Sequence, residues 1–316
     1  MPLDRRAERL LAMLAATQSD PDASESPAAR RMALSALAQM ADDASAPAQV
    51  GDLHFSGPGE RVNLRSYSQP GTTEGAVPAL VFFHGGGWVA GDLDTHDGFC
   101  RRLALAAGCR VIAVDYRRAP EHPFPAALDD CLAATRWVAA HADTLRIAPD
   151  RLAVGGDSAG GGLAAAVALA ARDAGPSLAA QLLVCPILDA GRATGSRAEL
   201  ADGYFVGRAA FARDLAAYLP PDADAGDPRL SPLRAGDVSG LPPTILHTAE
   251  FDPFRDEGEA YAERLRAARV AVETTRHAGQ IHYFYALARA IPAAHDAATL
   301  IGAQLRTAFT RARPTP

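Results

Sequence analysis

The sequence Gly156-Asp157-Ser158-Ala159-Gly160 decides the fold of this chain. It has the form G-x-S-x-G, in which a serine occupies a strained turn between a strand and a helix and exposes its hydroxyl. A short apolar run at 152–154 precedes it, and an alanine-rich stretch at 161–171 with high helix propensity follows it. The glycines on either side would let strand and helix approach closely around the serine. We therefore expect a strand–turn–helix unit that presents Ser158 as a nucleophile.

A second glycine-rich string, His84-Gly85-Gly86-Gly87, lies upstream of the first and follows a strand-like run at 79–83. Backbone N–H groups in such a loop can bind an oxyanion, because no bulky side chains block the approach. Either string alone is weak evidence, since G-x-S-x-G arises by chance in glycine-rich chains. Both strings in this order, each after a strand-like run, predict a serine hydrolase.

A serine nucleophile needs a general base, and the base needs a carboxylate that fixes its tautomer. In enzymes with this elbow the acid and then the histidine follow the serine along the chain. Asp252 lies in the turn after a strand-like run at 245–249, and we expect it to be the acid, with Glu250 as the alternative. His282 lies beyond the next such run and is the expected base, with His277 as the alternative.

Three other polar residues have structural interpretations. His247 lies inside a strand-like run and is expected to be a hydrogen-bonded structural histidine. His295 falls in the terminal helix and is expected to be exposed to solvent. Asp157 adjoins the nucleophile, but neighbouring side chains in an elbow point in different directions. We therefore expect Asp157 to anchor neighbouring loops.

Five strings together resemble the bacterial hormone-sensitive-lipase-like esterases, in the subgroup whose elbow reads G-D-S-A-G. They extend from about residue 79 towards the C-terminus. The strings are the elbow, His84-Gly85-Gly86-Gly87-Trp88, Asp115-Tyr116-Arg117-Arg118-Ala119-Pro120-Glu121-His122-Pro123-Phe124-Pro125-Ala126-Ala127, Asp252-Pro253-Phe254-Arg255-Asp256-Glu257-Gly258 and Gly279-Gln280-Ile281-His282-Tyr283-Phe284.

The resemblance implies an α/β-hydrolase fold, with a mostly parallel sheet of about eight strands flanked by helices and covered by a helical cap. It implies a catalytic triad and thereby decides against Glu250 and His277. It also implies an oxyanion hole made of three backbone N–H groups. The triad residues are Ser158, Asp252 and His282, and the oxyanion-hole residues are Gly85, Gly86 and Ala159.

The chain departs from the family pattern at two positions. Phe254 stands where leucine is usual, and Cys185 stands where tyrosine is frequent. We expect neither departure to touch the chemistry.

Composition excludes several classes of function. The chain has 316 residues and a formal net charge of −6, which gives no basic field for nucleic acid or an anionic membrane. Its four cysteines form no C-x-x-C pair, so we expect buried thiols and a cytoplasmic protein. No carboxylate–histidine cluster resembles a metal site, and a serine triad needs no metal, so we also expect no metal site and no cofactor. The expected partner is a small-molecule ester, and the sequence leaves a homodimer open.

The chain is long enough for one core at 49–316, to which two cap segments are added. Residues 1–48 carry two helical patterns around a loop at 19–27, and the apolar stretch at the start is broken by Glu8 and Arg9. This favours an amphipathic helix over a signal peptide. A second cap segment is expected at about 192–221, where aromatic residues concentrate. No apolar run is long enough for a membrane span.

These features predict a carboxylic-ester hydrolase that acts on short- to medium-chain acyl esters. An amidase or arylformamidase is the first alternative, because acyl transfer to water would use the same three residues. A non-catalytic small-molecule receptor is the second, although such a protein would be expected to lose the base. The sequence does not identify the natural ester or the stereochemical preference.

Overall fold

The computed structural model describes residues 1–17, 26–71, 75–191 and 195–311. Within these ranges an eight-stranded sheet has the order β1-β2-β4-β3-β5-β6-β7-β8. Strand β2 is antiparallel to both of its neighbours, and the other pairs are parallel, which confirms the expected mostly parallel sheet. The strands are Gln49–Ser56, Arg61–Ser68, Val77–Phe83, Arg110–Asp115, Ile147–Asp157, Ala180–Val184, Thr244–Phe251 and Val272–Ile281, numbered β1 to β8.

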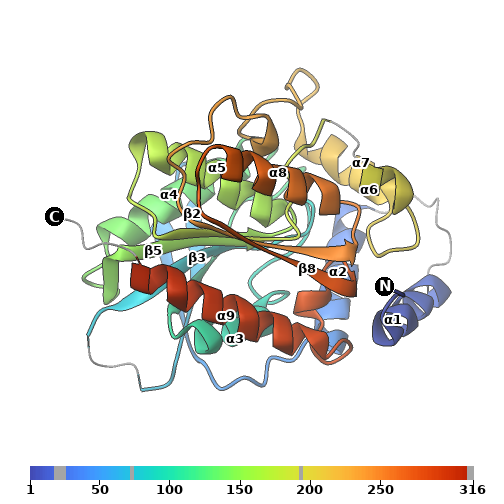
Figure 1. Cartoon of the computed structure of the whole chain (residues 1–316), viewed down its shortest axis with the longest axis horizontal. Coiled ribbons are helices and arrows are strands. Elements are labelled where there is room, and N and C mark those ends of the chain that lie inside the picture. Colours follow the sequence, from blue (N-terminus) through green and yellow to red (C-terminus); the bar gives the residue numbers. More distant parts are fainter. Residues whose placement is uncertain (18–25, 72–74, 192–194, 312–316) are drawn as a thin grey trace.

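Helices cover both faces of the sheet, as Figure 1 shows. Helices α4 (Ala126–Ala140), α5 (Ala159–Ala174) and α8 (Arg255–Ala267) lie on one face. Helices α3 (Asp97–Ala107) and α9 (Ala293–Arg311) lie on the other. A hydrophobic core lies on each face of the sheet, and alternate side chains of β3 point into different cores. Ala79, Val81 and Phe83 pack in one core, and Leu80 and Phe82 pack in the other. Burial on both faces explains why the parallel strands read as continuous apolar runs.

The N-terminal segment forms helices α1 (Arg5–Thr17) and α2 (Pro27–Ala41). The Ser26 hydroxyl caps α2 by accepting the Ala29 N–H at 3.2 Å, and proline suits the first turn because it has no N–H to donate. Pro27 therefore belongs to the helix and not to the expected loop. Most of that loop, residues 19–25, lies outside the described residues.

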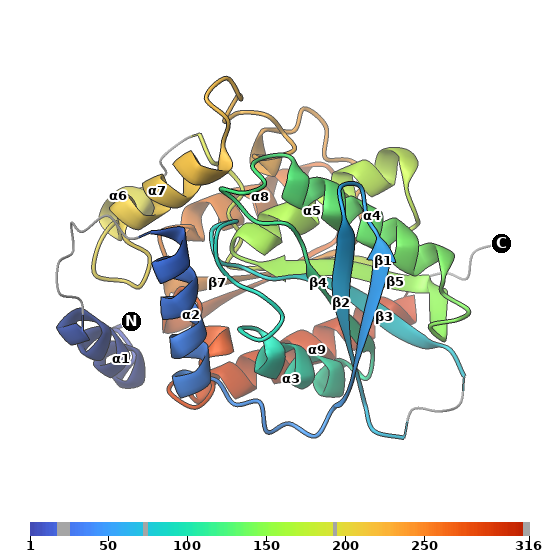
Figure 2. The ribbon, with the colours of Figure 1, turned by 180° about the vertical axis from the view of Figure 1, so that it is seen from behind.

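A second helical insertion follows β6 and contains α6 (Gly195–Glu199) and α7 (Arg208–Tyr218). Residues 192–194 at its start lie outside the described residues. Figures 1 and 2 place α6, α7 and α2 together at one end of the sheet, the end to which the arrowhead of β8 points. This is the edge at which ligand sites of open α/β sheets gather.

The last strand is longer than the sequence indicates. The strand-like run in the sequence ends at residue 275, but β8 pairs with β7 as far as Ile281. His277 therefore lies inside the strand, and His282 follows its last residue. Two short 3₁₀ turns, η1 (Pro232–Arg234) and η2 (Phe284–Ala286), complete the connections. Across the part of the chain that the structure describes, none of the helices combines the length and apolar character needed to cross a bilayer.

Candidate active site

Ser158 occupies a strained turn between β5 and α5. Its backbone angles are φ 53° and ψ −121°, a conformation that costs free energy in a residue with a Cβ. The surrounding backbone holds this conformation, because the Ser158 N–H donates to the Val184 carbonyl at 2.9 Å. A Cβ on Gly160 would collide with the carbonyl oxygens of Phe83 and His84, so only glycine fits there. The elbow thus has the geometry expected from its sequence.

The structure brings Ser158, His282 and Asp252 into one hydrogen-bonded row. His282 Nε2 lies 2.9 Å from Ser158 Oγ, and His282 Nδ1 lies 2.8 Å from Asp252 Oδ2. All three side chains are buried. Since a carboxylate only accepts, Nδ1 carries the proton and Nε2 is free to accept the serine proton. Asp252 directly follows β7 and His282 directly follows β8, so the ends of neighbouring parallel strands create the contact.

The alternative acid and base lie elsewhere. Glu250 belongs to β7, and its carboxylate binds the Met1 ammonium group at 2.6 Å and the Gly279 N–H at 2.7 Å. His277 Nε2 lies 2.8 Å from Nδ1 of His247, which is buried in the sheet as expected of a structural histidine. His295 is exposed on α9. None of these four residues has a recorded contact with Ser158 in the described chain.

The glycine-rich loop lies beside Ser158, but one of its N–H groups is already used. The Gly85 N–H donates to Asp157 Oδ1 at 2.9 Å, so the expectation that it faces an oxyanion does not hold. The described residues provide no acceptor for the N–H groups of Gly86, Gly87 or Ala159. Gly86 (φ +120°) and Gly87 (φ +63°) have left-handed backbone conformations that favour glycine. Gly87 lies in the same sequence string, but the sequence does not show the direction in which each N–H group of the loop points.

Asp157 is the buried centre of a polar network. Besides the Gly85 N–H, its carboxylate accepts the Tyr285 hydroxyl at 2.8 Å and lies 3.2 Å from His96 Nε2. Burial alone would raise the pKa of Asp157, but His96 and Tyr285 hold it below its usual value. Burial likewise opposes protonation of His96, yet the charge of Asp157 raises the pKa of His96. Asp157 therefore anchors the glycine-rich loop, as its position suggests, whereas His96 and Tyr285 were not predicted.

The two departures from the family pattern both lie against the candidate triad, which the sequence did not indicate. The Phe254 ring packs edge-on against His282, with centroids 5.3 Å apart. Cys185, just after β6, places its sulfur within 4.8 Å of ligand atoms of Asp252 and His282. Strand ends converge here, and the sequence alone does not show which side chains follow them inward. Because Asp252 and His282 already share a hydrogen bond, we interpret this group as an acid–base pair and not as a metal site.

The inserted helix α6 makes polar and ring contacts with the segment that follows Asp252. The Ser196 hydroxyl donates to the Pro253 carbonyl at 2.8 Å. The Arg197 guanidinium pairs with the buried carboxylate of Glu257 at 2.6 Å and lies over the Phe254 ring, 5.2 Å from its centroid. Burial raises the pKa of Glu257 to about 8, although Arg197 opposes this shift. Glu257 stands in a string that the sequence analysis singled out, but nothing in the sequence pairs it with Arg197.

Known proteins of similar sequence and structure are alpha/beta hydrolases and esterases. A family profile for the alpha/beta hydrolase fold matches residues 80–286. The carboxylic ester hydrolase LipN of Mycobacterium tuberculosis is 46% identical over 71% of this chain, and the match spans 61% of that relative's own length. The ethyl acetate hydrolase of Pseudomonas putida is 38% identical over 88% of both chains. A variant of LAE6, an alpha/beta hydrolase enzyme from the metagenome of Lake Arreo in Spain, has a TM-score of 0.93 at 40% identity, over 98% of this chain and 99% of that one.

The fold and the site are those of an alpha/beta hydrolase with a serine elbow. The chain belongs to the alpha/beta hydrolase family, in its hormone-sensitive-lipase-like branch. It is an enzyme that hydrolyses carboxylic esters, because its relatives and structural neighbours are carboxylesterases and esterases.

Proposed function

We propose that Ser158, His282 and Asp252 carry out ester hydrolysis as a catalytic triad. His282 Nε2 takes the Ser158 proton while Oγ attacks the ester carbonyl, and Asp252 stabilises the imidazolium that forms. His282 then gives this proton to the departing alcohol, which leaves an acyl-enzyme. Water repeats the sequence and releases the acid. The observation that carries the proposal is the row Ser158 Oγ–His282 Nε2 and His282 Nδ1–Asp252 Oδ2, with contacts of 2.9 and 2.8 Å.

For the oxyanion hole we propose the backbone N–H groups of Gly86, Gly87 and Ala159. Gly87 replaces Gly85 because the Gly85 N–H is donated to Asp157. The Ala159 N–H begins α5, where the first N–H groups of a helix have no partner within it. Such donors act on the charge that develops in the transition state, and removing one typically costs about 3–4 kcal/mol.

We propose that residues 1–48 and about 192–221 form a cap over this site, and that the enclosed site favours short- to medium-chain acyl groups. The proposal is supported by aromatic residues of the insertion that pack beside the candidate triad. The Phe205 ring lies 6.4 Å from that of His282, and Phe211 packs edge-on against Phe254 at 5.2 Å. A relative named for ethyl acetate hydrolysis handles a small ester. An acyl-length series of para-nitrophenyl esters, from acetate to dodecanoate, tests this preference, and a maximum at the long end would contradict it.

The triad proposal is tested with Ser158→Ala. We expect kcat on para-nitrophenyl butyrate to fall by about 10⁴- to 10⁶-fold while the thermal unfolding midpoint stays close to wild type. Ser239→Ala, on an exposed loop, is the matched control and should retain full turnover. Activity of Ser158→Ala near that of the control would overturn the proposal.

The amidase alternative is tested by comparing an aryl ester with its matching anilide, and we expect the ester to be the faster substrate. For the location we propose the cytoplasm, a proposal supported by four cysteines that are all buried as free thiols. The exclusion of nucleic-acid partners and the open question of a homodimer remain predictions from the sequence.

A further inference from the structure

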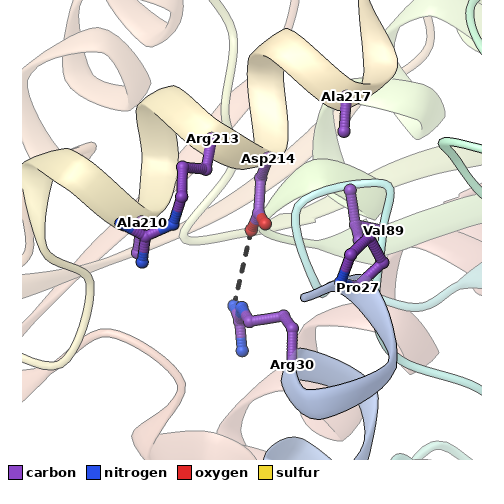
Figure 3. Close-up of a pocket in the computed structure, with 7 residues that line it drawn as sticks. All are labelled: Pro27, Arg30, Val89, Ala210, Arg213, Asp214 and Ala217. Carbon is purple, nitrogen blue, oxygen red and sulfur yellow. Dashed lines mark ion pairs between the residues drawn. The ribbon is translucent and has the colours of Figure 1, made fainter. Parts of the chain in front are cut away.

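A small cavity lies between helices α2 and α7, next to the glycine-rich loop. Its volume is about 180 Å³, and Figure 3 shows the residues of its wall. Whole drug-sized ligands occupy sites of roughly 300–1,000 Å³, so this cavity suits one end of a small substrate. Pro27 and Arg30 come from α2, Val89 from the loop after β3, and Ala210, Arg213, Asp214 and Ala217 from α7.

The wall carries two positive charges and one negative charge. In Figure 3, Arg30 on α2 projects towards Asp214 on α7, and Arg213 projects from α7 beside Ala210. Arg30 and Asp214 form an ion pair at 3.6 Å, which is longer than a good hydrogen bond. Among the seven residues drawn this is the one marked ion pair, so the Arg213 charge is not balanced within the wall.

The arginines have unused hydrogen-bond donors. Arg30 Nε is buried and has no hydrogen-bond partner among the described residues. A buried donor without an acceptor costs free energy, and a ligand oxygen in the cavity would remove that cost. The first turn of α2 also faces the cavity through Pro27, and the N-terminal end of a helix favours negative charge. Two guanidinium groups in this arrangement suit a carboxylate, which they can bind with several N–H groups.

The cavity wall and the nucleophile adjoin opposite ends of the glycine-rich string. The Asp214 carboxylate occupies the space that a Cβ on Gly87 would need. At the other end of the same glycine string, a Cβ on Gly85 would lie 3.0 Å from Ser158 Cβ. Three consecutive residues span at most about 7 Å, so a short ester could place its carbonyl at Ser158 and a second group in the cavity.

We propose that this cavity binds a carboxylate of the ester substrate, so that the enzyme prefers esters that carry a negative charge a few atoms from the bond it cleaves. The inference rests on the proposed triad and names the substrate class of that site. The carboxylate belongs either to the acyl part or to the alcohol part of the ester, and the two cases are separated by two pairs of substrates.

The first pair compares para-nitrophenyl hemisuccinate with para-nitrophenyl butyrate, which have acyl chains of the same length. The second pair compares acetoxyacetate with ethyl acetate, in which the charge lies on the alcohol part. Ser158→Ala supplies the background rate, which matters because the hemisuccinate can hydrolyse through its own carboxylate. We expect kcat/KM of the wild-type enzyme to favour the charged ester in one pair, and added salt to reduce the preference.

Two variants test which residues cause the preference for the charged ester: Arg213→Gln and Arg30→Gln. The control is Arg136→Gln, on the exposed face of α4. We expect the charged-to-neutral ratio of kcat/KM to fall by about tenfold or more in Arg213→Gln and Arg30→Gln, and to stay unchanged in the control. A wild-type enzyme that hydrolyses neutral esters but disfavours both charged partners would overturn this inference and leave the triad proposal standing. A preference that survives both arginine substitutions would also overturn it. If Ser158→Ala instead retained turnover of neutral esters, the triad proposal itself would be contradicted.

Discussion

The Asp157 carboxylate accepts the Gly85 N–H at 2.9 Å, although the two residues lie 72 positions apart. This bond joins the nucleophile elbow to the glycine-rich loop, because Asp157 directly precedes Ser158 and Gly85 directly precedes Gly86. One buried side chain thus links Ser158 to the free N–H groups at Gly86 and Gly87. Asp157 acts through its neighbours and is a positioning residue.

We predict that Asp157→Asn lowers kcat by tenfold or more while KM changes little, since the loop donors that it positions matter most in the transition state. An asparagine amide must turn N–H groups towards donors that now face a carboxylate, so the unfolding free energy should also fall, by about 1–3 kcal/mol. Steady-state kinetics and urea unfolding measure the two effects.

Asp143→Asn, in the exposed turn after α4, is the control for the loss of one negative charge. An Asp157→Asn enzyme with wild-type kcat would show that the glycine loop holds its shape without this carboxylate. A kcat that falls only in proportion to the unfolded fraction would assign Asp157 to stability alone.

Features set by residues close together in the sequence could be predicted, whereas features set by contacts between distant residues could not. The elbow at Ser158 and the buried strand at 79–83 depend on neighbours in sequence, and both have the predicted structure. The Gly85 N–H could not be assigned, because its direction is set by Asp157 across the fold. His277 was placed after the last strand because polar residues 273–277 hide the continued pairing of β8 with β7.

The contacts of Phe254 and Cys185 show the same limit for side chains. Both residues lie next to segments whose strands were predicted, yet their contacts with the candidate triad arise only when β6, β7 and β8 end at one edge. The pair of Arg197 and Glu257 joins an inserted helix to α8, and no local pattern connects the two residues.

We predict that acid weakens the fold through a pair of histidines, the buried His247 and the half-buried His277. His247 donates to Gln304 through Nε2 and accepts from His277 through Nδ1, at 2.7 and 2.8 Å, so the His247 ring is neutral. Burial and the neighbouring His277 lower the pKa of His247 to about 3, and burial lowers that of His277 to about 4, from an ordinary 6.5. The unfolded chain takes up protons below pH 6.5 while the folded protein does not. The free energy of unfolding should therefore fall between pH 6.5 and about 4, by up to about 1.4 kcal/mol per pH unit for each histidine.

His277→Gln removes one of these titrating groups and should make the decline with pH shallower. His54→Gln, on the exposed strand β1, should leave the decline unchanged. Urea unfolding at several pH values between 4 and 7 measures the slopes. Equal slopes in the wild type and His277→Gln would contradict the predicted neutral pair.

We predict that Arg197→Met destabilises the protein by about 1–3 kcal/mol, because the fully buried Glu257 carboxyl group loses its contact with Arg197 and is left with the Leu188 N–H. The double variant Arg197→Met with Glu257→Gln should lose less than the sum of the two single variants, since the contact between the two side chains is lost only once. Thermal unfolding of the two single variants and the double variant forms a double-mutant cycle. Additive losses would show that the two side chains do not stabilise each other.

The last prediction concerns Arg31, which connects α2 to the loops that follow β3 and β4. Its Nε donates to the Val89 carbonyl at 2.8 Å, and its Nη2 donates to the Ala119 carbonyl at 2.9 Å. A lysine cannot reproduce this fork, because its ammonium group is a single point on a flexible chain. We expect Arg31→Lys to lower kcat/KM by several-fold and to speed proteolysis within residues 1–48, since α2 would separate from the core more often. Arg9→Gln, exposed on α1, is the control and should change neither quantity. Faster proteolysis without a loss of kcat/KM would mean that α2 contributes stability but no part of the substrate site, and it would contradict the proposed N-terminal cap.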